Sequence, residues 1–388
     1  MNYNTEKLRE LSIIRTGKLD SNAAVDDGEY PFFTCDPQTL RIDNWAYDTE
    51  AVLLAGNNAS GNYTAKYYCG KFNAYQRTYI IETADPQKIN VRFLCYAMNE
   101  KLRLLKTMSS GSTTKFLTIK MLHDLDIPCP SIKTQESILE ILGTLDDLIS
   151  NSQNQIELME EATQRLYKHW FVDMRFPGHE KTEFENGIPK NWEKCSLGSI
   201  FDVVRGRSYT SKELSDSDGV LMINLSNIRA YGGYNRKQEK HYTGKYNKEQ
   251  AVKPNDLLLG VTDMTQERRT VGRVALAPDL KTDAMISMDL VKLVPHDESA
   301  FFYYGMLIFG GYSELLSRFA NGTNVLHLRP DVLDMIDVYL PEVELRNLYA
   351  EKFAVFQRRI TALQDQIINA EEARERLLPK LMSGEIEL

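Results

Sequence analysis

Residues 122–166 read LHDLDIPCPSIKTQESILEILGTLDDLISNSQNQIELMEEATQRL, and residues 333–377 read LDMIDVYLPEVELRNLYAEKFAVFQRRITALQDQIINAEEARERL. The second stretch repeats the first at an offset of 211 positions without a gap, so that Pro130 falls on Pro341. Matches in one fixed register over this length indicate a duplication within the chain. The period is far too long for a solenoid of short repeats. The sequence therefore predicts two related halves, each ending in a copy of this stretch.

Both copies carry the pattern of a long helix. Seam positions recur at alternating steps of four and three residues, which is the heptad pattern of a coiled coil. In the first copy the seam comprises Ile138, Leu142, Leu145, Ile149, Ser152, Ile156, Met159, Thr163, Leu166 and Trp170, and in the second it comprises Tyr349, Phe353, Phe356, Ile360, Leu363, Ile367, Ala370, Arg374, Leu377 and Leu381. Because proline is poorly tolerated inside a helix, Pro130 and Pro341 mark the start of each helix. We predict a first helix from about Lys133 to Phe171 and a second that ends at Ser383-Gly384.

Each predicted helix needs a partner for its apolar stripe, and the simplest partner is the other helix of the same chain. If the two helices pair antiparallel, a pseudo-twofold axis relates the halves. A heptad pattern alone is more often a structural or oligomerising coiled coil. Here two diverged domains are attached to the matched helices, which a chain that served only as a spacer would not need. This favours a further role for the chain.

The remaining segments are expected to form α+β domains. Short apolar runs at residues 51–54, 79–81, 257–259 and 290–294 are predicted strands, and the runs at residues 93–98 and 301–307 are predicted helices. The predicted division is a first domain at residues 1–130, the first long helix and a linker at 131–190, a second domain at 191–341 and the second long helix at 342–388. The predicted fold class is α+β, with two α/β domains joined by two long antiparallel coiled-coil helices in a pseudo-twofold internal repeat.

Composition narrows the class of protein. The chain of 388 residues is 43% hydrophobic and 26% charged, as in globular domains, and contains no run of eighteen apolar residues that predicts a membrane span. Its five cysteines form no CxxC pair, which argues against a disulfide framework or structural zinc and favours a reducing cytoplasm. The net charge of −8 is not that of a simple basic nucleic-acid binder, although residues 131–190 hold much of the excess acid.

Motifs of catalysis are largely absent from the sequence. There is no Walker loop, no HExxH, and no Pro-Pro pair of the kind expected in a DNA methyltransferase. The six histidines are scattered without the spacing of metal ligands. Asp279-Leu-Lys281 resembles a fragment of a nuclease motif but lacks the preceding Pro-Asp element. The sequence thus predicts a chain that neither makes nor breaks a covalent bond.

Polar loops in both halves are the predicted DNA-binding surface. Amide, hydroxyl and guanidinium groups can hydrogen-bond to base edges, and lysines can contact phosphates. For any single residue, the alternative is an ordinary polar turn. The predicted DNA-binding residues are Lys18, Asn57, Asn58, Ser60, Asn62, Tyr63, Lys66, Lys71, Ser112, Thr113, Thr114 and Lys115 in the first half, and Arg205, Arg207, Tyr209, Asn224, Asn227, Thr265, Gln266, Arg268, Arg269, Thr323 and Asn324 in the second.

Taken in order, several motifs resemble the specificity subunits of type I restriction-modification systems. They are Gly17-Lys18, Gly28-Glu-Tyr-Pro-Phe-Phe33, Gly70-Lys-Phe-Asn-Ala-Tyr75, Gly111-Ser-Thr-Thr-Lys115, Ile127-Pro-Cys-Pro130 and Gln135, followed by Trp192, Leu197-Gly-Ser-Ile200, Leu340-Pro341 and Leu377-Leu-Pro-Lys-Leu-Met-Ser-Gly-Glu385. No one motif is specific, but their order and duplication are. The first half lacks a segment like the one that contains Trp192 at the start of the second half, so its first strand is expected to be short.

This resemblance implies two target-recognition domains, each reading one half of a bipartite DNA target. It also implies that the helices set the spacer and dock DNA adenine methyltransferase subunits, of which two are expected, and in some systems restriction subunits. S-adenosylmethionine, and ATP with magnesium, are expected in those partner subunits, and no cofactor or metal in this chain. The alternatives are a coiled-coil scaffold that does not read sequence, and a solitary nuclease or methyltransferase, against which the missing motifs count.

Overall fold

The computed structural model describes residues 3–57, 63–108, 117–236 and 240–388, with only the backbone described at 104–108. The chain forms two compact units. Unit 1 comprises residues 1–152 and 365–388, and unit 2 comprises residues 153–364. The unit boundaries fall inside both long helices, whereas the predicted domain limits lie at the helix ends. Those limits stay a prediction.

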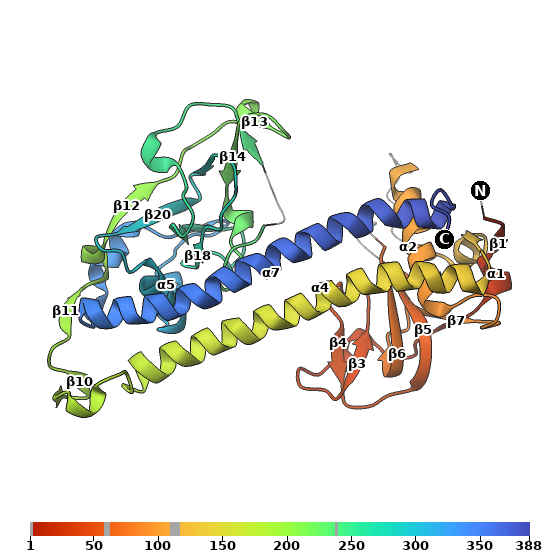
Figure 1. The fold of residues 1–388 in the computed structure, drawn as a ribbon, viewed down its shortest axis with the longest axis horizontal. Coiled ribbons are helices and arrows are strands. Elements are labelled where there is room, and N and C mark those ends of the chain that lie inside the picture. The colour runs from red at the N-terminus through yellow and green to blue at the C-terminus, as the bar shows by residue number, and fades with distance from the viewer. Residues whose placement is uncertain (1–2, 58–62, 109–116, 237–239) are drawn as a thin grey trace. The chain divides into compact units, whose positions relative to one another are not determined.

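Unit 1 is built around one sheet and the helix that covers it (Figure 1). Its strands are β1 (Thr5–Lys7), β2 (Ser12–Thr16), β3 (Tyr30–Phe33), β4 (Leu40–Ile42), β5 (Tyr47–Ala55), β6 (Ala65–Ala74), β7 (Thr78–Thr83) and β8 (Asp126–Pro128), and its shorter helices are α1 (Leu8–Leu11), α2 (Val91–Met108) and α3 (Ile119–His123). Six strands form the sheet in the order β2-β7-β5-β6-β3-β4, antiparallel throughout except between β3 and β6. The first strand, β1, is short as expected and pairs with β8 just before Pro130.

The predicted strand at residues 51–54 lies in the middle of β5, and both faces of the sheet are covered there. Val52 and Leu54 join the core that contains α2, whereas Ala51 and Leu53 pack with Phe72 on the opposite face. Successive side chains of a strand point to opposite faces, so a strand that is buried on both sides reads as a continuous apolar run.

The described part of unit 2 contains two four-stranded sheets. Its strands are β9 (Phe184–Glu185), β10 (Ile188–Pro189), β11 (Glu193–Ser196), β12 (Phe201–Arg205), β13 (Leu214–Ser215), β14 (Val220–Ile223), β15 (His241–Tyr242), β16 (Leu257–Gly260), β17 (Thr262–Asp263), β18 (Val274–Leu276), β19 (Ala284–Ile286), β20 (Leu290–Pro295), β21 (Leu326–His327) and β22 (Asp337–Leu340), and its shorter helices are α5 (Ala300–Phe309) and α6 (Tyr312–Arg318). The sheets have the orders β12-β20-β16-β18 and β13-β15-β14-β19. β11 pairs with β22 just before Pro341, as β1 pairs with β8 in unit 1.

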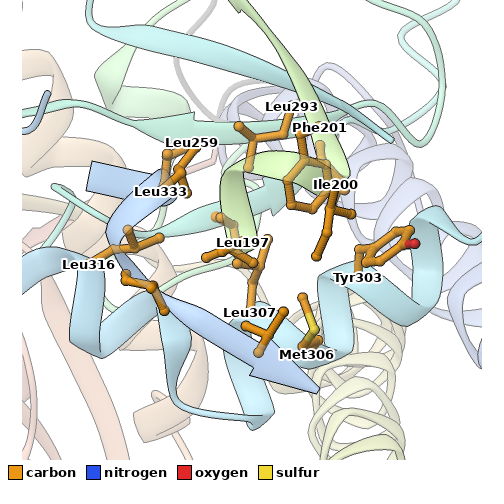
Figure 2. Packing of buried hydrophobic residues seen from close by; sticks show 14 of the residues in the cluster. Leu197, Ile200, Phe201, Leu259, Leu293, Tyr303, Met306, Leu307, Leu316 and Leu333 are labelled. Atoms are coloured by element: carbon orange, nitrogen blue, oxygen red, sulfur yellow. The ribbon is translucent and has the colours of Figure 1, made fainter. Parts of the chain in front are cut away.

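The first of these sheets is again buried on both faces. Leu259 and Leu293 belong to the same core as Met306 and Leu307 of α5, with Leu197 between them (Figure 2). Leu258 joins a second core beneath the other sheet. The predicted strands at 257–259 and 290–294 and the predicted helix at 301–307 are thus confirmed. The predicted linker is more ordered than expected, because β9 and β10 form a small hairpin within it.

The two long helices begin at equivalent points. α4 (Ile132–Tyr167) and α7 (Val343–Ser383) each start two residues after the marker proline, and a π-helical turn at Lys168–Val172 extends α4. The predicted end of the second helix is confirmed, with Gly384 at φ +73°. Most seam positions are buried, namely Ile138, Leu142, Ile149, Ser152, Ile156, Thr163, Trp170, Tyr349, Phe353, Ile360, Leu363, Ala370 and Leu381.

Segments of the two helices contact each other within each unit. In unit 1, Arg374 Nη1 of α7 lies 2.7 Å from Asp146 Oδ1 of α4. In unit 2, Arg359 contacts Gln155, and Tyr349 packs edge-on against Tyr167 with a centroid distance of 5.7 Å. The residue number rises along α4 as it falls along α7, so these segments of unit 2 run antiparallel. The mixed helix and sheet content and the long helices agree with the predicted fold class.

Candidate nucleic-acid interface

One end of the β12-β20-β16-β18 sheet gathers most of the residues predicted in unit 2. The register sets Arg205 opposite Val291 and Gly260 opposite Leu290, so β12 and β16 end where β20 begins. Three loops therefore meet at this end of the sheet, at residues 206–209, 261–270 and 287–289. We call it the reading end of unit 2.

The loop after β16 is organised by one buried carboxylate. Asp263 is 3% exposed and accepts hydrogen bonds from the backbone N–H groups of Thr265 and Thr270, both at 2.7 Å. It also accepts from their hydroxyls at 2.8 and 3.0 Å. Burial acts to raise the pKa of Asp263, but these hydrogen bonds more than offset that effect and hold the pKa below its ordinary value of 3.8. The carboxylate thus fixes the course of the backbone between the two threonines.

The fixed loop presents the predicted residues of this segment. Thr265, Gln266 and Arg269 are exposed, and Arg269 forms an ion pair with Glu267. Arg268 is half-buried, has a left-handed backbone with φ +54°, and holds Nε shielded from solvent without a hydrogen-bond partner among the described residues. A buried donor of this kind is uncommon in a folded protein.

A second predicted loop lies beside the first. β17 pairs with β21, and Gln266 Nε2 donates to the carbonyl of Thr323 at 2.8 Å. Thr323 and Asn324 are exposed. The fold therefore joins two polar segments that the sequence showed only as separate loops.

Arg205 and Arg207 flank Gly206 at the same end of the sheet, and both side chains are exposed. Glycine is required between them because a Cβ would overlap the carbonyl oxygen of Ser287. Tyr209 is half-buried, and burial raises its phenol pKa, with a smaller contribution from the nearby Asp289.

Two predicted residues, Asn224 and Asn227, shape the backbone of their own turn. Asn224 and Asn227 are 6% and 4% exposed. Asn224 Oδ1 accepts from the backbone N–H of Ser226 at 2.9 Å, and Asn227 Oδ1 accepts from that of Asn224 at 3.0 Å. Their amides therefore shape the turn after β14. DNA contact there stays an untested prediction.

In unit 1, Lys18 and Asn57 lie at the corresponding end of the large sheet. Lys18 is exposed and follows Gly17, whose N–H donates to the carbonyl of Thr78 at 3.1 Å. Asn57 is half-buried after β5. With its amide oxygen turned toward Arg77, it accepts from Nη1 at 2.6 Å. This is the reading end of unit 1.

The other described residues predicted in unit 1 are dispersed. Lys66 donates from Nζ to the carbonyl of Pro37 at 2.7 Å, and burial lowers its pKa against the opposing effect of Asp36. Lys71 is exposed, with Nζ 4.7 Å from the centre of the Trp45 ring. Tyr63 lines a cavity of about 800 Å³ beside α2, together with Tyr96, Asp146 and Arg374.

Seven predicted residues lie outside the part of the chain that the structure describes. They are Asn58, Ser60, Asn62, Ser112, Thr113, Thr114 and Lys115.

Sequence reasoning missed two exposed residues at the reading end of unit 1, Gln76 and Arg77, and one in unit 2, Met288. All three lie in short turns that follow one strand and precede the next. Gly17, from the motif Gly17-Lys18, and Gly206, between the predicted Arg205 and Arg207, were the available signal. They pack against these turns.

The reading ends combine guanidinium, amide, hydroxyl and ammonium groups. Such groups can contact phosphates and the edges of bases. Within the described ranges, no three His, Cys, Asp or Glu side chains are grouped so as to hold a metal ion. Nor does the described part of the chain contain a helix that is long and apolar enough to cross a membrane.

Comparison with known proteins places the chain among relatives. The family model of the type I restriction modification DNA specificity domain matches residues 2–160 and 189–375. The chain belongs to this family. Its two matched segments cover both of the halves that the sequence repeat predicts.

Individual relatives of the specificity-domain family agree with this assignment. The specificity subunit of the type I restriction enzyme EcoDI from Escherichia coli is 34% identical over 226 residues, covering 52% of this chain and 50% of that protein. The specificity subunit of the MjaIX enzyme from Methanocaldococcus jannaschii is 27% identical over 297 residues, covering 73% and 65%. The matches thus span about half to two thirds of these relatives' lengths.

A solved structure shows the same fold. The crystal structure of the S subunit of a type I restriction-modification system from M. genitalium superposes with a TM-score of 0.65 at 16% identity, covering 98% of this chain and 96% of that one.

Proposed function

We propose that this chain is the DNA-recognition component of a type I restriction-modification complex. The observation that carries the proposal is the reading end of unit 2. There the exposed Gln266, Thr323 and Asn324 lie at the same end of the sheet as Arg205 and other basic side chains. Family membership supports the same function.

Each unit reads one half of a bipartite target in this proposal. Arginine pairs with guanine and glutamine or asparagine with adenine through two hydrogen bonds, so side chains of these types specify bases. Lysines and backbone groups contribute phosphate contacts that position the protein. We infer that Arg205, Arg207, Gln266 and Arg269 contribute to unit 2, and that Lys18 contributes to unit 1.

The long helices set the distance between the half-sites in this proposal. α4 and α7 each contain a boundary between the units, and both carry a buried heptad seam. Contacts between the helices within each unit support pairing as an antiparallel coiled coil, with the halves related by a pseudo-twofold axis. Two helices that restrain each other make a stiffer spacer than a flexible linker would.

The partner subunits carry the chemistry. We propose that this chain contributes no catalytic residue, and that the complex contains DNA adenine methyltransferase subunits, two in number, with restriction subunits in addition where the system has them. S-adenosylmethionine, and ATP with magnesium, then bind to those partners. Cytoplasmic localisation follows from this role, because the target is the genome.

A map of methylated adenines tests the proposal. Cells that express this chain with its cognate methyltransferase are expected to methylate a bipartite motif with a fixed gap, and cells without this chain are expected to lack that motif. The matched control replaces residues 1–130 with the equivalent segment of a relative. The chimera is expected to change one half of the motif alone. An identical map with and without the chain would refute the proposal.

A further inference from the structure

Each reading end contains a short turn, and the two turns are held by similar sets of backbone hydrogen bonds. In unit 1 the turn joins β6 to β7 at residues 75–77, and in unit 2 it joins β19 to β20 at residues 287–289. Each turn is closed by one hydrogen bond across it. Thr78 N–H donates to the carbonyl of Tyr75 at 2.8 Å, and Leu290 N–H donates to that of Ser287 at 3.0 Å.

The glycine that follows β2 in unit 1, and the one that follows β12 in unit 2, bind to this turn in the same way. Gly17 N–H donates to the carbonyl of Thr78, and Gly206 N–H donates to that of Leu290, both at 3.1 Å. In each case a Cβ on the glycine would overlap a backbone carbonyl of the turn or of the residue before it. Only glycine permits so close an approach of two backbones.

The central strand binds to the turn from its other side. Gly56 N–H donates to the carbonyl of Arg77 at 2.7 Å, and Val261 N–H donates to that of Asp289 at 2.9 Å. The chain that leads toward each long helix closes the set. Leu117 N–H donates to the carbonyl of Gly56 at 2.9 Å, and its repeat counterpart Leu328 donates to that of Val261 at 2.8 Å.

The middle residue of each turn is held by its backbone and displays its side chain. Gln76 N–H donates to the carbonyl of Leu19, and Met288 N–H donates to that of Arg207, both at 2.9 Å. Both side chains are exposed, and Met288 is 53% exposed. The backbone hydrogen bonding is thus similar in the two units, with an acceptor two residues after Gly17 in unit 1 and one residue after Gly206 in unit 2. The displayed side chain, in contrast, differs in chemistry.

We infer that these turns hold matching base-reading positions, occupied by Gln76 in unit 1 and Met288 in unit 2. The inference rests on the proposed function and deepens it. A bipartite reader needs one scaffold that presents different side chains to its two half-sites, and these positions meet that requirement.

The chemistry of each side chain indicates which base it contacts. Gln76 donates from Nε2 to Asp20 Oδ1 at 2.7 Å, which orients the amide and leaves its oxygen and its second N–H for a base. That pair of groups matches the edge of adenine in the major groove. Met288 offers only an apolar surface, and the corresponding feature of DNA is the thymine methyl group. Gln76 therefore reads adenine and Met288 reads thymine.

The test maps methylated adenines for the full chain with its cognate methyltransferase, with Gln76→Ala and Met288→Ala as the variants. Each variant is expected to relax the motif at one base, in different halves. For Gln76→Ala, which removes a two-pronged hydrogen-bonding group, discrimination at that base should fall about 5- to 150-fold. The matched controls are Gln87→Ala and Met335→Ala. Both control side chains are also exposed and lie away from the turns. Gln87 follows the end of β7 that is far from the turn. Met335 precedes Ile336, whose carbonyl accepts a hydrogen bond from the N–H of Leu197, ahead of the start of β12.

The outcomes separate the inference from the proposed function. A wild-type map without a bipartite motif refutes the proposed function itself. A normal wild-type motif that both variants retain unchanged overturns the inference and leaves the proposed function standing.

If a variant loses methylation altogether, competition binding of the purified complex to duplexes decides. A loss of affinity confined to the cognate duplex supports reading by that side chain. An equal loss on cognate and mismatched duplexes overturns it and indicates a positioning role.

Discussion

Replacing Asp263 by alanine should loosen the reading end of unit 2 and destabilise the unit. The carboxylate is 3% exposed and accepts from two backbone N–H groups at 2.7 Å. A hydrogen bond to a charged group contributes about 1.5–3 kcal/mol, so the two backbone bonds together amount to about 3–6 kcal/mol. Thr265 is exposed, so water can replace part of the hydrogen bonding that its N–H loses. We therefore expect the free energy of unfolding to fall by about 3–4 kcal/mol.

Thermal and urea unfolding of the purified chain measure this change. For a unit of this size each kcal/mol lowers Tm by about 2–4 °C, so the unfolding transition of unit 2 is expected about 6–16 °C lower. Asp216→Ala, at an exposed aspartate of the same unit, is the control and is expected to change stability by less than about 0.5 kcal/mol. A loss below about 1 kcal/mol for Asp263→Ala would show that the carboxylate does not hold the loop.

The same residue gives a pH dependence of known sign. Its pKa is lowered in the folded state, so it contributes stability above the ordinary aspartate value of 3.8 and loses that contribution as pH falls through the lower folded value. The difference in stability between wild type and Asp263→Ala should therefore be constant at neutral pH and shrink below about pH 3.8. A difference that instead grew on acidification would contradict the assignment.

Three further predictions concern the core, the helix contact and the spacer. Leu258→Ala empties a fully buried position of the unit 2 sheet and should cost about 2–5 kcal/mol in urea unfolding, whereas Leu315→Ala, at a partly exposed leucine, should cost much less. Asp146→Ala removes the acceptor of Arg374 and Tyr96 in unit 1 and should cost about 1–2 kcal/mol, with Asp147→Ala, at a largely exposed neighbour, as control. Deleting one heptad from both long helices removes about 10 Å of helix, or about three base pairs. It should shorten the spacer or abolish methylation, and an unchanged gap would refute the proposed role of the helices.

Much of the secondary structure could be predicted because a strand that is buried on both faces has a continuous apolar run in its sequence. The apolar runs at residues 51–54 and 257–259 became β5 and β16 for this reason. The long helices were predicted from the heptad seam, whose recurring positions are mostly buried. The hairpin of β9 and β10 was missed, because strands of two residues leave no periodicity to detect.

The candidate site was harder to predict, because a polar residue in a loop has the same appearance in sequence whatever its environment. Asn224 and Asn227 are predicted as DNA-binding residues, and only the structure shows that their side chains also hydrogen-bond inside the turn that they shape. Gln76 directly follows the motif Gly70-Lys-Phe-Asn-Ala-Tyr75, but nothing in the sequence showed that Gln76 and Met288 occupy similar turns. Their backbones are held by hydrogen bonds to Leu19 and Arg207, which lie more than fifty residues away in the chain.

The sequence by itself determined the duplication, the two long helices and their limits, and the strands that form the cores. These features depend on local periodicity and on proline and glycine, which act over a few residues. Only the tertiary structure decided which loops share a sheet end and which polar side chains remain exposed there. That outcome depends on strand register and on hydrogen bonds such as the one from Gln266 to Thr323, which join segments that no local pattern connects.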